Sequence, residues 1–206
     1  MIIKELVVGP IASNCYILGC ESTKNAVVID PGDEPHRILM ELAKDELTAK
    51  YILNTHGHFD HVGGNAKLKE VTGAELMIHE ADAPMLTQLS NMARMWGMRV
   101  ENSPPPDRFL TEGMEITFGD CTLKVLHTPG HSPGGVTFLS PAGVFAGDLL
   151  FAGSIGRTDF PGGSHETLIR SVKEKLFVLP DDTKVYPGHG PATTVGREKR
   201  YNPFFG

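Results

Sequence analysis

The sequence is poor in cysteine, and its few thiols do not form a metal-binding pair. Cys15, Cys20 and Cys121 are an odd number of cysteines with no C-x-x-C spacing, which argues against a disulfide framework and against a sulfur-based zinc site. We expect these cysteines to be reduced and mostly buried, as is usual in a cytoplasmic protein.

Basic residues are also in short supply. Lysine and arginine together number 19, against 25 aspartates and glutamates, which gives a formal net charge of -6. Strong nucleic-acid binding depends on neutralising phosphates with basic side chains. We therefore expect no nucleic-acid partner.

Long apolar runs are missing as well. No run in the sequence approaches the length of a membrane span, so we expect no membrane partner. The first residues, M-I-I-K-E-L-V-V, place an acid beside their single lysine and are typical of a first strand and not of a signal peptide. The expected location is the cytoplasm, and the sequence leaves the oligomeric state open.

The composition that is present fits one globular domain spanning residues 1–206. Hydrophobic residues make up 40% of the chain and charged residues 21%, and the 23 glycines and 15 prolines predict many short elements joined by tight turns. No linker rich in proline or serine divides the chain.

Short β-branched segments between turn residues predict two series of strands. The expected strands are residues 2–8, 14–20, 26–29, 51–54 and 75–79, then 115–118, 122–126, 135–139, 143–146 and 184–186. Helical spacing of apolar residues predicts helices at 34–47, 62–71 and 164–179. The β-α-β-α-β order of the first half indicates a layered α/β fold. Two β-rich halves without a linker suggest two sheets packed face to face.

One stretch concentrates potential metal ligands directly after the expected strand 51–54: Thr55-His56-Gly57-His58-Phe59-Asp60-His61. In an extended segment residues two apart share a face, so His56 and His58 can reach one ion together. Asp60 and His61 stand at the expected start of a helix and can turn toward a neighbouring point. Imidazole and carboxylate donors suit zinc, iron or manganese. Four donors aimed two ways predict two adjacent metals.

Three further ligand-type residues stand at strand ends beside glycine, as the first stretch does. They are His131, Asp148 and His189. Glycine lets the backbone approach an ion closely, so we expect these loops to meet the first stretch at one site. Lone histidines elsewhere are interpreted as structural hydrogen-bonding residues: His36, His79, His127 and His165.

Two other features have two interpretations each. Asp30, in the turn Asp30-Pro31-Gly32, is either an acceptor that orients a ligand imidazole or a simple turn aspartate. Residues 80–107 include a methionine-rich stretch, which either fills irregular core space or belongs to a mobile lid over the site.

The pattern H-x-H-x-D-H followed by distant His, Asp and His resembles the metallo-β-lactamase superfamily over essentially the whole chain, including V-I-D-P-G and T-P-G-H-S-P-G. Within it, the sequence is most similar to the type II glyoxalases (hydroxyacylglutathione hydrolases) and the related persulfide dioxygenases, with which it shares Gly156-Arg157-Thr158-Asp159-Phe160 in kind. The resemblance implies a four-layered αββα sandwich of two mixed sheets flanked by helices, with the metals at one edge.

The same resemblance implies how the ligands are divided. His56, His58 and His131 would hold metal one, Asp60, His61 and His189 metal two, and Asp148 would bridge both. β-Lactamases of the best-known class carry a cysteine where Asp148 stands, so antibiotic hydrolysis is disfavoured.

The leading functional interpretation is hydrolysis of a small-molecule thioester, including glutathione-derived ones. Two divalent ions, zinc first and iron or manganese as alternatives, would lower the pKa of a shared water toward about 7. Asp60 and Asp148 would orient the resulting hydroxide as well as bind metal. Arg157 is the candidate for holding a substrate carboxylate, unless it pairs with Asp159 instead.

Two other functions use the same residues. His56, His131 and Asp148 would form the two-histidine, one-carboxylate site of a mononuclear iron persulfide dioxygenase. A metal-stabilised binding domain is the non-enzymatic interpretation, and a purely structural site has no need of seven ligands.

Overall fold

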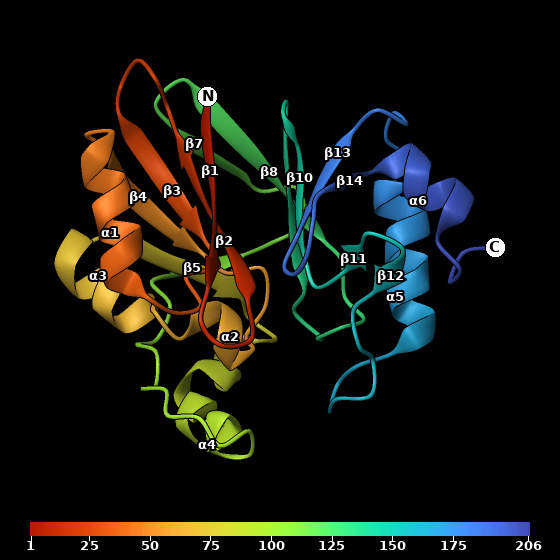
Figure 1. Cartoon of the computed structure of the whole chain (residues 1–206), viewed down its shortest axis with the longest axis horizontal. Helices are drawn as coiled ribbons and strands as arrows, with labels where there is room; N and C mark the ends of the chain where they lie inside the picture. The colour runs from red at the N-terminus through yellow and green to blue at the C-terminus, as the bar shows by residue number, and fades with distance from the viewer.

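The computed structural model describes residues 1–206, and its core is a pair of six-stranded sheets. The first sheet has the order β1-β2-β3-β4-β5-β6 and the second β14-β13-β10-β9-β8-β7. Figure 1 shows the two sheets face to face, with α1 and α3 outside the first sheet and α5 and α6 outside the second. The predicted αββα sandwich of the α/β class is confirmed.

Both sheets are mixed. In the first sheet β1, β2 and β3 are antiparallel and β3 to β6 are parallel. In the second, only β10 and β13 are parallel. The strands of the first sheet are β1 (Ile2–Val8), β2 (Ser13–Gly19), β3 (Asn25–Ile29), β4 (Thr48–Leu53), β5 (Glu75–His79) and β6 (Arg108–Leu110). Those of the second are β7 (Glu115–Phe118), β8 (Cys121–His127), β9 (Val136–Ser140), β10 (Gly143–Gly147), β13 (Lys184–Pro187) and β14 (Thr193–Thr194).

The strand β2 shows why the sandwich forms. All seven of its residues are buried, because side chains that alternate along a strand serve opposite faces of the sheet. Cys15 and Ile17 pack in the core under α1 and α3, whereas Tyr16 and Leu18 pack in the core between the sheets. A third core, which includes Val144 and Val185, lies under α5 and its continuation.

The helices differ in detail from the expected ranges. They are α1 (Pro35–Lys44), α2 (Phe59–Val62), α3 (Asn65–Thr72), α4 (Leu89–Arg94), α5 (His165–Ser171) and α6 (Val195–Tyr201), with a 3₁₀ helix η1 (Ala83–Gln88) and a π turn η2 (Val172–Leu176). The helix predicted at 62–71 is interrupted at Gly63 and Gly64, where a Cβ would lie 2.5 Å from the Gly32 carbonyl oxygen and 2.6 Å from that of Pro31 respectively. This close approach fixes the turn that carries Asp30 against the start of α3.

The methionine-rich segment packs in part. Leu86, Leu89 and Ala93 are fully buried in the core under α1 and α3, whereas Met95 and Trp96 are 87% and 54% exposed. The core-packing interpretation is therefore correct for one face of this segment, and a mobile lid over the site stays a prediction.

The cysteines, the helix lengths and one small hairpin can also be compared with what the sequence predicted. The cysteines are free, and Cys15 and Cys20 are buried whereas Cys121 is partly exposed. No helix has the length and apolar character needed to cross a membrane. A small hairpin, β11 (Leu150–Phe151) with β12 (Ser154–Ile155), was not expected from the sequence.

Candidate metal centre

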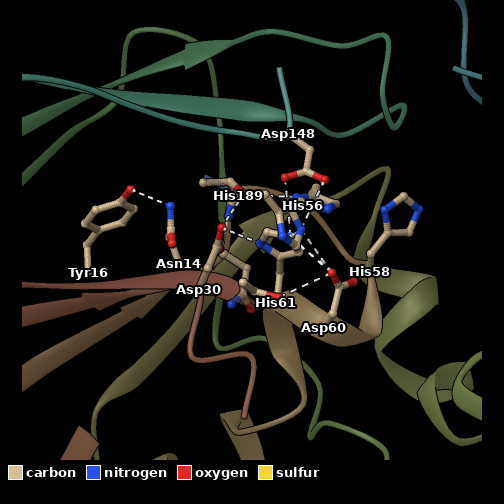
Figure 2. A network of polar contacts seen from close by, with 12 residues as sticks. Asn14, Tyr16, Asp30, His56, His58, Asp60, His61, Asp148 and His189 are labelled. Atoms are coloured by element: carbon tan, nitrogen blue, oxygen red, sulfur yellow. Dashed lines mark hydrogen bonds and ion pairs between the residues drawn. The ribbon is translucent and has the colours of Figure 1, made fainter. Parts of the chain in front are cut away.

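The predicted ligand residues converge at one edge of the sandwich (Figure 2). The loop after β4 carries His56 and His58, and α2 carries Asp60 and His61. The second sheet supplies the others, because His131, Asp148 and His189 follow β8, β10 and β13. These seven residues are called the candidate metal centre below.

The donors fall into two neighbouring groups. Atoms of His56, His58 and His131 lie within 4.8 Å of one another, as do those of Asp60, His61 and His189. In the first group, His58 Nδ1 and His131 Nε2 are 2.8 Å apart. In the second, His189 Nε2 is 3.2 Å from both His61 Nε2 and Asp60 Oδ2. These two groups have the members that the family resemblance implies, and Asp30, His56 and His61 also lie within 4.8 Å of one another.

Asp148 lies between the two groups. Its Oδ1 is 3.4 Å from His61 Nε2, and its Oδ2 is 3.6 Å from His131 Nε2 and 3.7 Å from His189 Nε2. One carboxylate therefore reaches donors of both groups, which is the position required of a bridging ligand.

The residues fit a pair of metal ions. His56 Nε2 and Asp148 Oδ1 are buried and have no hydrogen-bond partner, and a buried polar atom without a partner costs roughly 1–3 kcal/mol. Cations at this edge would satisfy both atoms. Five imidazoles and two carboxylates, without sulfur, suit zinc, iron or manganese.

The site shifts histidine pKa values in both directions, and those of His61 and His189 are raised. Burial disfavours the His61 cation, but Asp148, Asp60 and Asp30 outweigh this effect and raise the His61 pKa to about 10. Burial and the neighbouring His131 lower the His58 pKa to about 4. The carboxylates around His61 thus favour a positive charge at this position.

Asp60 remains ionised in this surrounding. Burial alone would raise its pKa, but His61 and His189 hold the pKa of this carboxyl below its usual range. Ser13 Oγ lies 3.3 Å from Asp60 Oδ2 and donates to it. At neutral pH, Asp60 is therefore a carboxylate that accepts hydrogen bonds and does not hold a proton.

Asp30 contacts a predicted ligand, as the first of its two interpretations requires. Its Oδ2 lies 3.1 Å from His61 Nδ1 (Figure 2), and its Oδ1 accepts the backbone N–H of Thr55 at 2.7 Å. With Nδ1 held by this carboxylate, His61 presents Nε2 to the centre. The Asp30 carbonyl also accepts the Gly32 N–H at 2.8 Å, so the residue shapes the turn as well.

Asp82 is a site residue that the sequence reasoning missed. It is fully buried, and its carboxylate accepts the N–H of Gly57 at 3.0 Å and that of Gly134 at 2.6 Å. It thereby joins the loop of His56 and His58 to the loop that carries His131. Its partners lie 25 and 52 residues away in the sequence, so no local motif signals this role.

A second missed element holds the turn of His189. Asn14 Nδ2 donates to the carbonyl oxygens of Pro187 and Gly190 at 3.0 and 2.9 Å, and the Tyr16 hydroxyl donates to that of Pro187 at 2.7 Å. Figure 2 shows Asn14 and Tyr16 beside His189. Strand β2 of the first sheet thus fixes a turn of the second.

The structure places Arg157 beside the site with its guanidinium already paired. Arg157 Nε and a terminal nitrogen donate to the Asp159 carboxylate at 3.0 and 2.8 Å, and the guanidinium lies 4.3 Å from the Phe160 ring centroid. The ion pair with Asp159 is therefore present, and carboxylate binding by Arg157 stays a prediction. The Arg157 carbonyl lies 2.7 Å from His131 Nδ1 and orients that ring.

The lone histidines lie outside the candidate metal centre. His79 and His127 stack on one another, with ring centroids 4.3 Å apart and planes 1° from parallel. His79 Nδ1 accepts the Ala81 N–H at 3.2 Å, and His127 Nε2 lies 3.1 Å from the Pro133 carbonyl oxygen. For these two the structural interpretation agrees with the contacts.

Known proteins resemble the chain along its whole length. The profile of the metallo-beta-lactamase superfamily matches residues 8–189. Hydroxyacylglutathione hydrolase GloC of Haemophilus influenzae is 40% identical over 208 residues, covering 99% of this chain and 98% of that protein. The solved structure of BLEG-1 B3 metallo-beta-lactamase has a TM-score of 0.92 at 38% identity, covering 99% of both chains. That of TTHA1623 in a di-iron-bound form has a TM-score of 0.90 at 45% identity, covering 98% of this chain and 99% of that one.

Proposed function

Because the chain belongs to the metallo-beta-lactamase superfamily of metallo-hydrolases, we propose that it is a thioester hydrolase of the hydroxyacylglutathione hydrolase type. The position of Asp148 between the two donor groups carries the proposal. The 40% identity with a relative described as a hydroxyacylglutathione hydrolase supports the choice of substrate class.

The residues of the candidate metal centre would hold two divalent ions, zinc first and iron or manganese as alternatives. Bound ions would supply a hydroxide at neutral pH and stabilise the negative charge that develops on the carbonyl oxygen. His56, His58 and His131 would hold one ion, Asp60, His61 and His189 the other, and Asp148 both.

Asp60 and Asp148 would also orient the nucleophile. The Asp60 carboxylate would accept a hydrogen bond from the attacking oxygen, and its Oδ2 also accepts one from Ser13 Oγ at 3.3 Å. Burial of His56 and His61, which are 1% and 0% exposed, keeps bulk water from one side of the site. Asp30 and the Arg157 carbonyl hold His61 and His131 by their Nδ1 atoms.

The leaving group explains the preference for a thioester. A thiol has a pKa of about 8.5, so a thiolate departs without a proton donor, whereas an amine needs one. Asp60 and Asp148 would bind the metal ions as carboxylates, so neither would serve as a proton donor.

Metal-dependent turnover tests the proposal. Protein stripped with a chelator and reloaded with zinc, iron or manganese is assayed on S-lactoylglutathione, with release of free thiol as the readout. We expect hydrolysis only in reloaded protein, with two metals bound per chain. A cephalosporin belongs in the same panel, because one similar structure is described as a B3 metallo-beta-lactamase. Absence of thioester cleavage in fully loaded protein would overturn the proposal.

A mononuclear iron persulfide dioxygenase is the second candidate. It is favoured by the proximity of Asp148 to His131, at 3.6 Å, beside His56. It leaves Asp60 and His189 without a role, although they lie 3.2 Å apart in a second donor group. Oxygen uptake on a persulfide with one iron bound, retained in His58→Ala, would favour this candidate; loss of thioesterase activity in the same variant favours hydrolysis.

A further inference from the structure

A cavity of about 250 Å³ adjoins the candidate metal centre. It lies between the turn that joins β1 to β2, helix α2 and residues 98–100 that follow α4. Figure 1 shows α4 directly below α2, at the edge of the first sheet where the site lies. Asp60 and Ser13 belong both to the cavity wall and to the hydrogen-bonded surroundings of the site. The cavity therefore opens on the reacting position from the side of Asp60.

Five of the twelve residues that line the cavity are hydrophobic. The apolar lining consists of Val8, Ile11, Phe59, Met98 and Val100. The volume is below the roughly 300–1,000 Å³ of pockets that enclose a whole drug-sized ligand. The space thus suits one substituent of a substrate whose reacting bond lies at the metal centre.

One cation faces this cavity without a partner. The ion pairs made by arginines in this structure involve Arg37, Arg108, Arg157, Arg197 and Arg200. Arg99 lines the cavity and is exposed, and its guanidinium forms neither an ion pair nor a hydrogen bond. Asp33, on the same wall, accepts the Glu34 N–H at 2.6 Å. A guanidinium binds a carboxylate through two parallel hydrogen bonds.

We propose that this cavity binds a carboxylate-bearing substituent of the substrate, with Arg99 as the partner of the carboxylate. The proposal rests on the thioester hydrolase function proposed above and names the substrate class more closely. Arg99 is the partner assigned to this cavity because its guanidinium is free, whereas that of Arg157 is paired with Asp159. The segment after α4 thus determines specificity.

A binding experiment tests the cavity independently of turnover. The probes are the thioether 3-(butylthio)propanoate and its primary amide, which differ only in charge, added to zinc-loaded protein. Trp96 is the only tryptophan and is 54% exposed, so its fluorescence reports on the same segment. We expect the acid to bind about three- to tenfold more tightly than the amide.

Two arginine variants make the test specific. Arg99→Gln should remove the preference for the acid, and Arg99→Lys should restore part of it. Arg94→Gln is the matched control, since Arg94 is an unpaired arginine of the same segment that does not line this cavity. Equal binding of acid and amide by the wild type would overturn the proposal. So would a preference that survives in Arg99→Gln, as expected if the carboxylate binds the metal ions alone.

Turnover then locates the carboxylate on the substrate. One thioester carries it on the thiol half, as in S-acetyl-3-mercaptopropanoate, one on the acyl half, as in S-ethyl thiosuccinate, and S-ethyl thioacetate carries none. Arg99→Gln should raise KM about three- to tenfold for one of the two acids and leave kcat within about twofold. If the wild type cleaves no thioester, the proposed function fails, while the fluorescence comparison still decides whether the cavity binds a carboxylate.

Discussion

Asp82 accepts a hydrogen bond from the N–H of Gly57 at 3.0 Å, and Gly57 is the residue between His56 and His58. The other carboxylate oxygen of Asp82 accepts the Gly134 N–H at 2.6 Å. A fully buried side chain thus fixes the distance between two loops that supply three histidines.

Replacement of Asp82 should loosen this connection. Asp82→Ala leaves two buried N–H groups without acceptors, and we expect unfolding free energy to fall by about 2–4 kcal/mol. Metal affinity of the His56, His58 and His131 group should fall as well, measured by competition with a chelator. Asp181→Asn is the control, since Asp181 is an exposed partner of Lys199 and Arg200 and should change stability by less than about 0.5 kcal/mol. Equal metal affinity in Asp82→Ala and wild type would contradict the prediction.

Replacement of Asn14 should affect the other donor group. Asn14→Ala removes two hydrogen bonds to the turn of His189, so we expect one of the two metal equivalents to be lost more easily on dialysis. Tyr16→Phe removes the bond to Pro187 and the one that the hydroxyl accepts from Asn14, but it keeps both Asn14 bonds to the turn and should have a smaller effect, about 1 kcal/mol in stability. Metal content after graded dialysis is the measurement. Simultaneous loss of both metals in Asn14→Ala would argue against separate support of the two groups.

The raised pKa of His61 predicts a pH dependence of the metal-free protein. The folded-state pKa of about 10 exceeds the unfolded value near 6.5. The stabilising contribution is therefore complete below about pH 6.5 and disappears as pH rises toward 10. Denaturant unfolding of chelated protein at pH 6, 8 and 10 should show this loss. His61→Gln should lack it, and metal-loaded protein should lack it too, because a ligand imidazole is already deprotonated.

Substitutions of Arg157 and of Asp159 should have opposite effects on KM if Arg157 binds a substrate carboxylate. If Arg157 takes a substrate carboxylate, Asp159→Asn should free the guanidinium and lower KM for acidic thioesters, whereas Arg157→Gln should raise it. We expect changes of about two- to fivefold, since both side chains are more than half exposed, at 56% and 66%. If KM is unchanged in both variants, Arg157 does not bind the substrate, and its role is limited to the ion pair with Asp159 and the carbonyl contact with His131.

Much of the fold and of the candidate metal centre could be predicted because short stretches of the sequence indicate them. Strands such as β5 and β7 have the bounds that the sequence predicted, and the spacing of His56, His58 and Asp60 indicated the candidate ligands directly. The helix break at Gly63 could not be predicted, since it comes from contact with the Gly32 carbonyl 31 positions away in the chain. Asp82 and Asn14 escaped notice for the same reason: their partners are distant in sequence, and an isolated Asp or Asn is common in turns.

Each sheet contributes an incomplete share of the donors. The first half of the chain supplies residues up to His61, and the second supplies His131, Asp148 and His189. During synthesis, an emerging polypeptide would therefore be unable to bind the two proposed ions until position 189 has left the ribosome and β13 has joined its neighbours. In the proposed two-metal arrangement, metal loading would accordingly be a late event in maturation, after both sheets have paired.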